Sequence, residues 1–117
     1  MDTETGKNEV HILWMNADPS VAYNMVFMYA GNAVRNKWWD EITVILWGPT
    51  QELAVQNQGI REHIKELQNL GVKFSACMTC AIELETKEDL EQMGVEVIRW
   101  GKKLTDKIKN KDNIIYV

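Results

Sequence analysis

The chain has 117 residues, the length of one domain, and it needs no disulfide to fold. Its net charge is −4 and its lysines form no long basic cluster, which disfavours nucleic-acid binding. No apolar stretch is long enough to span a bilayer, and the polar, acidic start lacks the apolar region of a secretory signal. A soluble cytoplasmic protein with no membrane partner is therefore expected.

The first elements along the chain are a tail, a strand and a long helix. Residues 1–9 are predicted to form a flexible N-terminal tail. Val10–Met15 is a continuous apolar run, typical of a strand covered on both faces. Asp18 is a good N-cap and Pro19 a good first residue for a helix to about Asn36. Apolar residues lie on more than one stripe of this helix, which indicates a second buried face against another subunit.

The rest of the chain alternates between strands and helices. Strands are predicted over 41–47, 72–76, 95–99 and 113–117, and helices over 58–70, 81–93 and 101–110. The helix at 81–93 should break near Glu85, where Thr86 could cap a second piece beginning at Lys87. This alternation predicts one α/β domain over residues 10–117, with a parallel sheet covered by helices on both faces. Periodicity leaves the order of the strands open.

Two thiols follow directly on the third predicted strand, in Cys77-Met78-Thr79-Cys80, and the chain has no other cysteine. The carboxyl ends of parallel strands meet at one edge of the sheet, where open α/β folds keep their active sites. The start of a helix there stabilises the thiolate, the reactive form of cysteine. In the cytoplasm such a pair is more often reactive or metal-binding than a permanent disulfide. Two cysteines supply only half of a tetrahedral zinc site, so neither a metal nor a cofactor is expected within one chain.

The other strand ends provide candidate pocket residues. Trp14 and Asn16 lie at the end of the first strand, Trp47 at the end of the second and Arg99 at the end of the fourth. These side chains are expected to shape a pocket around the thiols, with Arg99 able to hold an anionic sulfur species. Each has a plainer explanation, because cysteine often only packs, tryptophan serves cores and subunit interfaces, and a strand-end arginine is usually solvated. His11, within an apolar run, is expected to be structural.

Other folds with similar features fit the chain less well. Thioredoxin places its CxxC after an early strand and opposite a cis-proline, whereas both prolines here, Pro19 and Pro49, precede the motif. A flavodoxin needs a Ser/Thr/Gly-rich phosphate loop after its first strand, and this chain has none there. A response-regulator receiver would need an aspartate where Cys77 stands.

The order of the motifs instead resembles the DsrE/DsrF-like family, small α/β proteins of sulfur metabolism, over residues 10–117. The segments that carry the resemblance are Val44–Thr50 with Leu53 and Ala54, Gly71–Ala81, Met93–Val97 and the closing strand. The resemblance implies a three-layer α/β/α domain of the DsrEFH-like type with a five-stranded parallel sheet, assembled into homo- or hetero-oligomers, commonly trimers or hexamers. In the sulfur-relay members a cysteine after the third strand accepts a sulfane sulfur as a persulfide. Cys77 matches that position, and only some members share Cys80.

Three functional hypotheses follow. The leading one is a sulfur-transfer or sulfur-carrier domain in which Cys77 accepts sulfur from a donor protein and passes it to an acceptor, with Cys80 as a resolving or auxiliary thiol. Whether such a carrier turns over alone as a sulfurtransferase is left open. The second is a non-catalytic oligomeric binding module, suggested by the two-faced first helix and the tryptophan content. The third is a redox switch through a Cys77–Cys80 disulfide.

Overall fold

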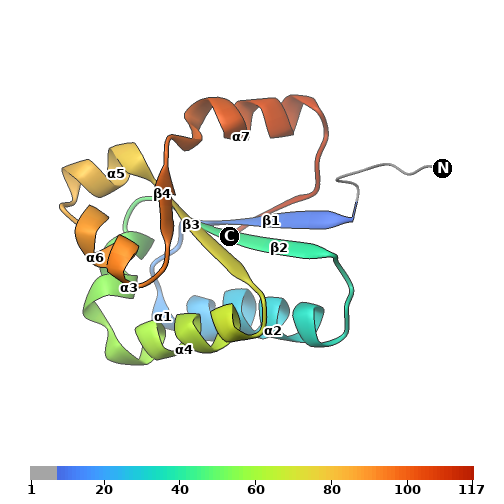
Figure 1. The fold of residues 1–117 in the computed structure, drawn as a ribbon, viewed down its shortest axis with the longest axis horizontal. Helices are drawn as coiled ribbons and strands as arrows, with labels where there is room; N and C mark the ends of the chain where they lie inside the picture. Colours follow the sequence, from blue (N-terminus) through green and yellow to red (C-terminus); the bar gives the residue numbers. More distant parts are fainter. Residues whose placement is uncertain (1–7) are drawn as a thin grey trace.

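The structure, a computed structural model, describes residues 8–117, which form five strands with helices between them (Figure 1). The strands are β1 (Glu9–Trp14), β2 (Glu41–Leu46), β3 (Lys73–Cys77), β4 (Glu96–Ile98) and β5 (Ile114–Tyr116). The helices are α1 (Pro19–Val21), η1 (Ala22–Phe27), α2 (Met28–Arg35), α3 (Thr50–Gln56), α4 (Gln58–Asn69), α5 (Met78–Glu83), α6 (Lys87–Gln92) and α7 (Trp100–Lys109). Residues 1–7 of the predicted tail lie outside the described part, and β1 already includes Glu9.

Most predicted elements are present, with two differences. The first helix begins where its cap predicted, because the Asp18 carboxylate accepts a hydrogen bond from the Ser20 N–H at 2.8 Å. Its middle, η1, is π-helical, a rare form that shifts the helix face by one residue. The second difference is α3, which has no regular apolar repeat and was not predicted. Within residues 8–117, every helix is too short or too polar to span a bilayer.

The sheet is entirely parallel, in the order β4-β3-β2-β1-β5. From β1 to β4 the chain always steps in one direction, and only the last connection returns across the sheet to β5. Because such crossovers are right-handed, the reversal moves α7 to the opposite face from the earlier helices. Figure 1 shows α7 on one side of the sheet and η1, α2 and α4 on the other. The predicted fold class, α/β with helices on both faces of a five-stranded parallel sheet, is therefore confirmed.

The two faces of the sheet differ strongly. The main core lies on the face with α2 and α4, and it includes Ala81 of α5 and Leu90 of α6. On the other face, the buried apolar cluster among residues 8–117 consists of Leu13, Ile45 and Trp100. At the amino ends of the strands, the positions on this α7 face are polar. They are His11 on β1, Thr43 on β2 and Lys73 on β3, which lie level with one another, and Ser75, beside Ile45, is a further polar position on this face. A parallel sheet covered on both faces normally has near-continuous apolar strands, so these polar positions are a departure.

His11 makes the α7 face sensitive to acid. Burial is the main cause that lowers the pKa of His11 from its ordinary 6.5 to about 4, with Lys107 and Lys103 acting in the same direction and Asp112 and Glu41 against it. Between these two pKa values the unfolded chain binds a proton at His11 and the folded chain does not, so stability falls as the pH drops.

We expect this residue alone to remove roughly 1–2 kcal/mol of unfolding free energy between about pH 7 and about pH 4.5, after allowing for screening by solvent. Urea unfolding at both pH values measures it, with the His11→Phe protein as the comparison. The variant should lose less stability on acidification than the wild type. An equal loss in both proteins would show that other groups cause the acid sensitivity.

Candidate functional site

The two thiols lie side by side at the carboxyl edge of the sheet. Cys77 is the last residue of β3 and the N-cap of α5, with the extended backbone of a cap. Cys80 lies three residues further, which places it one helical turn away on the same side. The Cys80 side chain is hydrogen-bonded with the Cys77 side chain and with the backbone N–H of Gly48. The predicted pairing of the two cysteines at a strand end is therefore present.

Gly48 brings the end of β2 to the thiols. Its φ is +71°, in the left-handed region that glycine adopts without strain. The turn it makes joins β2 to α3 and leaves the Gly48 N–H free of the sheet, so that it can donate to the sulfur of Cys80. Because a Cβ at this position would meet no atom within 4 Å, a substitution here would act through the backbone alone.

The thiols differ in exposure, and the pKa of Cys80 is raised. Cys77 is 5 % exposed, and Cys80 is intermediate. Burial and then the hydrogen bond with Cys77 raise the pKa of Cys80, while the Gly48 N–H lowers it; the nearby Glu83 carboxylate adds to the rise. Cys80 is therefore predominantly a protonated thiol at neutral pH, and a weaker nucleophile than a free cysteine.

This difference predicts how the folded protein reacts with an alkylating agent. Iodoacetamide at neutral pH should modify Cys80 before Cys77, because Cys77 is buried, and both should react at least ~10-fold faster once the chain is unfolded in urea. A time course of peptide mass spectra measures the two rates separately. Modification of Cys77 first would instead mean that the start of α5 opens readily in the native state.

A buried hydrogen-bond network holds the backbone under Cys77. The Gln51 side chain, on α3, donates from Nε2 to the carbonyl oxygens of Cys77 at 3.0 Å and Leu46 at 3.2 Å. Its Oε1 accepts from the Thr86 hydroxyl at 2.8 Å. Gln51 and Thr86 are both buried. One amide therefore ties β2, β3 and the start of α6 together, which fixes the position of Cys77.

Thr50 makes a second connection at the same edge. Its hydroxyl donates to the Trp14 carbonyl at 3.0 Å and accepts from the Trp47 N–H at 3.1 Å, so it joins the ends of β1 and β2. The sequence reasoning missed both α3 residues as parts of the site. The available signal was the Gly48-Pro49-Thr50 turn itself, which predicts a chain reversal at a strand end but not where the next side chains point.

Thr86 occupies the N-cap of α6, as predicted, but its side chain makes no cap hydrogen bond. The hydroxyl instead binds Gln51 across 35 residues of sequence. Local sequence preference therefore predicted the N-cap position of Thr86 correctly, but its side chain makes a tertiary hydrogen bond instead of a capping one.

The predicted pocket residues are only partly brought together. Arg99 is exposed and follows Ile98, the β4 partner of Cys77, so its backbone lies at the neighbouring strand end while alternation turns its side chain to the opposite face from Cys77. Trp14 is fully buried in the main core, where its ring packs against Phe27 with centroids 5.5 Å apart. By strand alternation Cys77 points to the opposite face, so Trp14 is separated from it.

The remaining two predicted pocket residues lie at the other strand ends. Trp47 is half-buried against the small cluster under α7. Asn16 is exposed; its carbonyl accepts from the indole N–H of Trp14 at 2.8 Å, and its side chain accepts from the Asp18 N–H at 2.9 Å. Asn16 therefore shapes the β1–α1 turn. Within residues 8–117, no group of three or more His, Cys, Asp or Glu side chains is placed to hold a metal ion.

Comparison with known proteins identifies the fold. The sequence matches no protein-family profile and no curated protein. The structure is similar to a conserved protein of unknown function from Bacteroides thetaiotaomicron, with TM-score 0.94 and 27 % identity over 99 % of this chain and 100 % of that one. It is also similar to the YchN protein of E. coli, with TM-score 0.70 and 14 % identity over 94 % and 99 % of the two chains.

A third similar structure, a protein of unknown function from Methanobacterium thermoautotrophicum, has TM-score 0.70 and 19 % identity over 93 % of this chain and 98 % of that one. YchN and the Methanobacterium protein have the DsrE-like fold. The domain described here therefore has a DsrE-like fold. None of these three names states an activity. The comparisons therefore support the fold, and a function has to be argued from the residues of the site.

Proposed function

We propose that the domain is a sulfur carrier, with Cys77 as the residue that holds the transferred sulfur. The observation that carries the proposal is the contact between the Cys77 and Cys80 thiols at the carboxyl edge of the sheet, beside the Gly48 N–H. The Cys77 thiolate attacks the outer sulfur of a donor persulfide, forms Cys77–S–SH and releases the donor thiolate. An acceptor thiolate then takes the outer sulfur and regenerates the Cys77 thiolate.

The acidity of Cys80 favours a carrier over a redox switch. To resolve the persulfide, the Cys80 thiolate would attack the inner sulfur of Cys77–S–SH, form a Cys77–Cys80 disulfide and release HS⁻. Burial and the hydrogen bond with Cys77 raise the pKa of Cys80, so little thiolate is available for that attack at neutral pH. The persulfide can then last until an acceptor arrives. Persistent free thiols also suit the cytoplasm, which we propose as the compartment.

Access to Cys77 requires a local movement. Because its side chain is 5 % exposed, a donor reaches the sulfur only when the start of α5 opens or when a docked donor displaces the side chains around it. Cys80, the more exposed thiol, is in contact with Cys77. Arg99, exposed on the neighbouring strand end, can attract the anionic persulfide of the donor.

The test is to incubate the full chain with a persulfide donor such as cysteine persulfide, and to map the product by peptide mass spectrometry without reduction. We expect one added sulfur atom on the Cys77 peptide, removed by a small thiol acceptor. Formation of a Cys77–Cys80 disulfide with release of sulfide would support the redox switch instead. Absence of any product, with both thiols unreactive until unfolding, would make the cysteines structural.

A second candidate function, a non-catalytic oligomeric module, is favoured by exposed apolar side chains on the first helix. Met28 is 54 % exposed at the start of α2, and Trp38, which follows α2, is 53 % exposed. The Trp38 ring lies 6.0 Å from that of Tyr29, whose hydroxyl accepts from Trp39 Nε1 at 2.9 Å, so this surface is ordered by side-chain contacts. We propose that it binds further copies of the chain, and the family resemblance suggests a trimer or hexamer.

Light scattering coupled to size-exclusion chromatography tests the assembly. A Met28→Lys and Trp38→Lys double variant should dissociate an oligomer that the wild type forms, because lysine is depleted in interface cores. The Ile108→Lys protein is the control, since Ile108 is also exposed, at 49 %, but lies on α7. A wild type that remains a monomer at about 100 µM would exclude the interface as a stable one.

A further inference from the structure

A cavity lies at the opposite end of the sheet from the thiols. It is a groove of about 790 Å³ between α7 and the amino ends of β2, β3 and β4. We call it the amino-end groove. Its lining includes His11, Ser75, Trp100, Lys103 and Lys107. Nothing in the proposed sulfur chemistry uses this part of the molecule.

The topology explains why the groove is open. The chain crosses this face only once, with α7, because the other connections lie on the opposite face. α7 packs on the apolar carboxyl half of the strands, through Trp100 against Leu13 and Ile45. The amino half of the same face carries His11, Thr43 and Lys73, which give a helix no apolar surface to cover. Ser75, level with Ile45, adds a polar side chain to the lining. The groove is the uncovered polar half of the face.

His11 leaves a polar atom without a partner in this groove. Its side chain is 9 % exposed, and its Nδ1, which is covered by neighbouring side chains, makes no hydrogen bond. The nearest acidic oxygen, Oε1 of Glu9, is 4.0 Å away, too far for a hydrogen bond. A buried nitrogen without a partner costs folding free energy, so a bound molecule that pairs with it gains that free energy on binding.

Trp100 holds the groove residues in place. Its indole N–H donates to the Ser75 hydroxyl at 2.7 Å, and that hydroxyl donates to the Glu96 carbonyl at 2.9 Å. The His11 ring meets the Trp100 ring edge-on with centroids 5.9 Å apart. The ammonium of Lys103 lies 5.4 Å from the centre of the same ring. Trp100 therefore brings the unpartnered imidazole nitrogen and a lysine to neighbouring positions.

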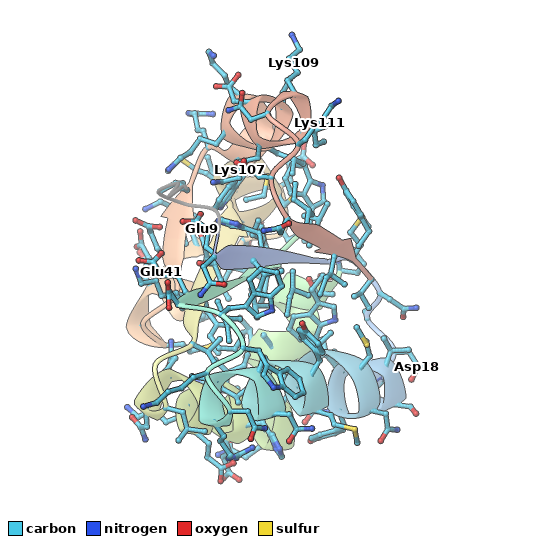
Figure 2. All side chains as sticks on the ribbon, turned by 90° about the vertical axis from the view of Figure 1, so that its right-hand side faces the viewer. Glu9, Asp18, Glu41, Lys107, Lys109 and Lys111 are labelled. Atoms are coloured by element: carbon cyan, nitrogen blue, oxygen red, sulfur yellow. The ribbon has the colours of Figure 1, made fainter. Side chains whose placement is uncertain are left out.

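The charge of the groove is positive although the chain as a whole is acidic. Four lysines line it against two glutamates, Glu41 and Glu96, in a protein of net charge −4. Lys107 points from α7 towards Glu9 (Figure 2), and their charged atoms are 3.8 Å apart. Lys103, by contrast, has no carboxylate within 4.0 Å among residues 8–117, so its charge is available to a ligand.

We propose that the amino-end groove binds a small organic anion, a phosphate ester or carboxylate that also carries a hydroxyl group. The anionic group pairs with Lys103, and the hydroxyl hydrogen-bonds with Nδ1 of His11 when the side chains that cover this nitrogen shift to admit the ligand. Charge-assisted pairing and the filling of an unsatisfied buried site both contribute to affinity. The site is independent of the thiols, so it stands whether or not Cys77 carries sulfur.

Isothermal titration calorimetry on the full chain tests the site with three probes, 3-phosphoglycerate, citrate and inorganic phosphate. We expect saturable binding of 3-phosphoglycerate or citrate that is tighter than that of inorganic phosphate, which has no alcohol hydroxyl. Preference for 3-phosphoglycerate would identify a phosphate-ester site, and preference for citrate a carboxylate site. Inorganic phosphate binding as tightly as both would overturn the role of His11.

Two variants and a matched control locate the binding. Lys103→Gln and His11→Phe should each weaken the organic anion by ~10-fold or more, while Lys109→Gln, the same change on α7 outside the groove, should leave the affinity unchanged. His11→Phe should also raise the melting temperature, because it removes the unpaired nitrogen and keeps an aromatic ring beside Trp100. No saturable binding of any probe up to ~10 mM, or equal losses in Lys103→Gln and Lys109→Gln, would overturn the proposal.

Discussion

Replacing Cys77 with serine is expected to abolish sulfur loading of the domain, while Cys80→Ser retains it. A hydroxyl is not nucleophilic enough to attack a persulfide at neutral pH, and it cannot hold sulfane sulfur. The comparison is informative because the variant should fold. Cys77 is an N-cap without a side-chain cap bond, and serine is among the better N-cap residues.

The measurement is the fraction of each protein that carries added sulfur after incubation with cysteine persulfide, with melting temperatures as the check of folding. The Cys80→Ser protein should hold its sulfur at least as long as the wild type, because the resolving attack is then impossible. Full loading of Cys77→Ser would move the reaction to Cys80 and refute the assignment of the carrier residue.

Replacing Gln51 with alanine is expected to lower the free energy of unfolding by about 3 kcal/mol. The change leaves the carbonyl oxygens of Leu46 and Cys77 and the hydroxyl of Thr86 without their partner, and it opens a cavity at a fully buried position. Urea unfolding at neutral pH measures the loss. The expected loss of unfolding free energy is this large because one buried side chain, which water does not reach, makes all three hydrogen bonds.

Two further variants separate hydrogen bonding from volume. Gln51→Met keeps most of the volume and loses the amide, so it should retain the larger part of the destabilisation. Gln56→Ala, an exposed change on the same helix, should cost less than ~0.5 kcal/mol. Similar stability of Gln51→Met and wild type would mean that packing rather than the hydrogen bonds holds this edge together. Any loss of sulfur loading in Gln51→Met would show that the position of Cys77 depends on the network.

The sequence was sufficient for the elements whose cause is local. The apolar runs predicted five strands, Asp18 and Pro19 marked the start of the first helix, and the break between α5 and α6 followed from the residues around Thr86. The thiols could be placed at a strand end for the same reason, because a strand, a turn and a helix start are read from adjacent residues. α3 was missed because its seven residues have no regular apolar repeat.

The candidate site was less predictable because its members come from distant parts of the chain. Gln51 contacts Thr86 across 35 residues, and neither residue type indicates a partner. Trp14 was expected beside the thiols because it ends a strand, but alternation along β1 points it into the main core. A strand end fixes the edge on which a residue lies, and the face follows only from the register.

What the sequence by itself determined was the α/β class and the presence of a thiol pair after the third strand. What only the tertiary structure decided was the strand order β4-β3-β2-β1-β5 and its consequence, the single helix α7 on one face. The reason is physical: hydrophobic periodicity records that a strand is covered, while the partner strands and the covering helix depend on contacts between segments far apart in the chain. Because the order of the strands reverses direction before β5, α7 lies alone on its face of the sheet, and His11 and Lys103 line an open groove there.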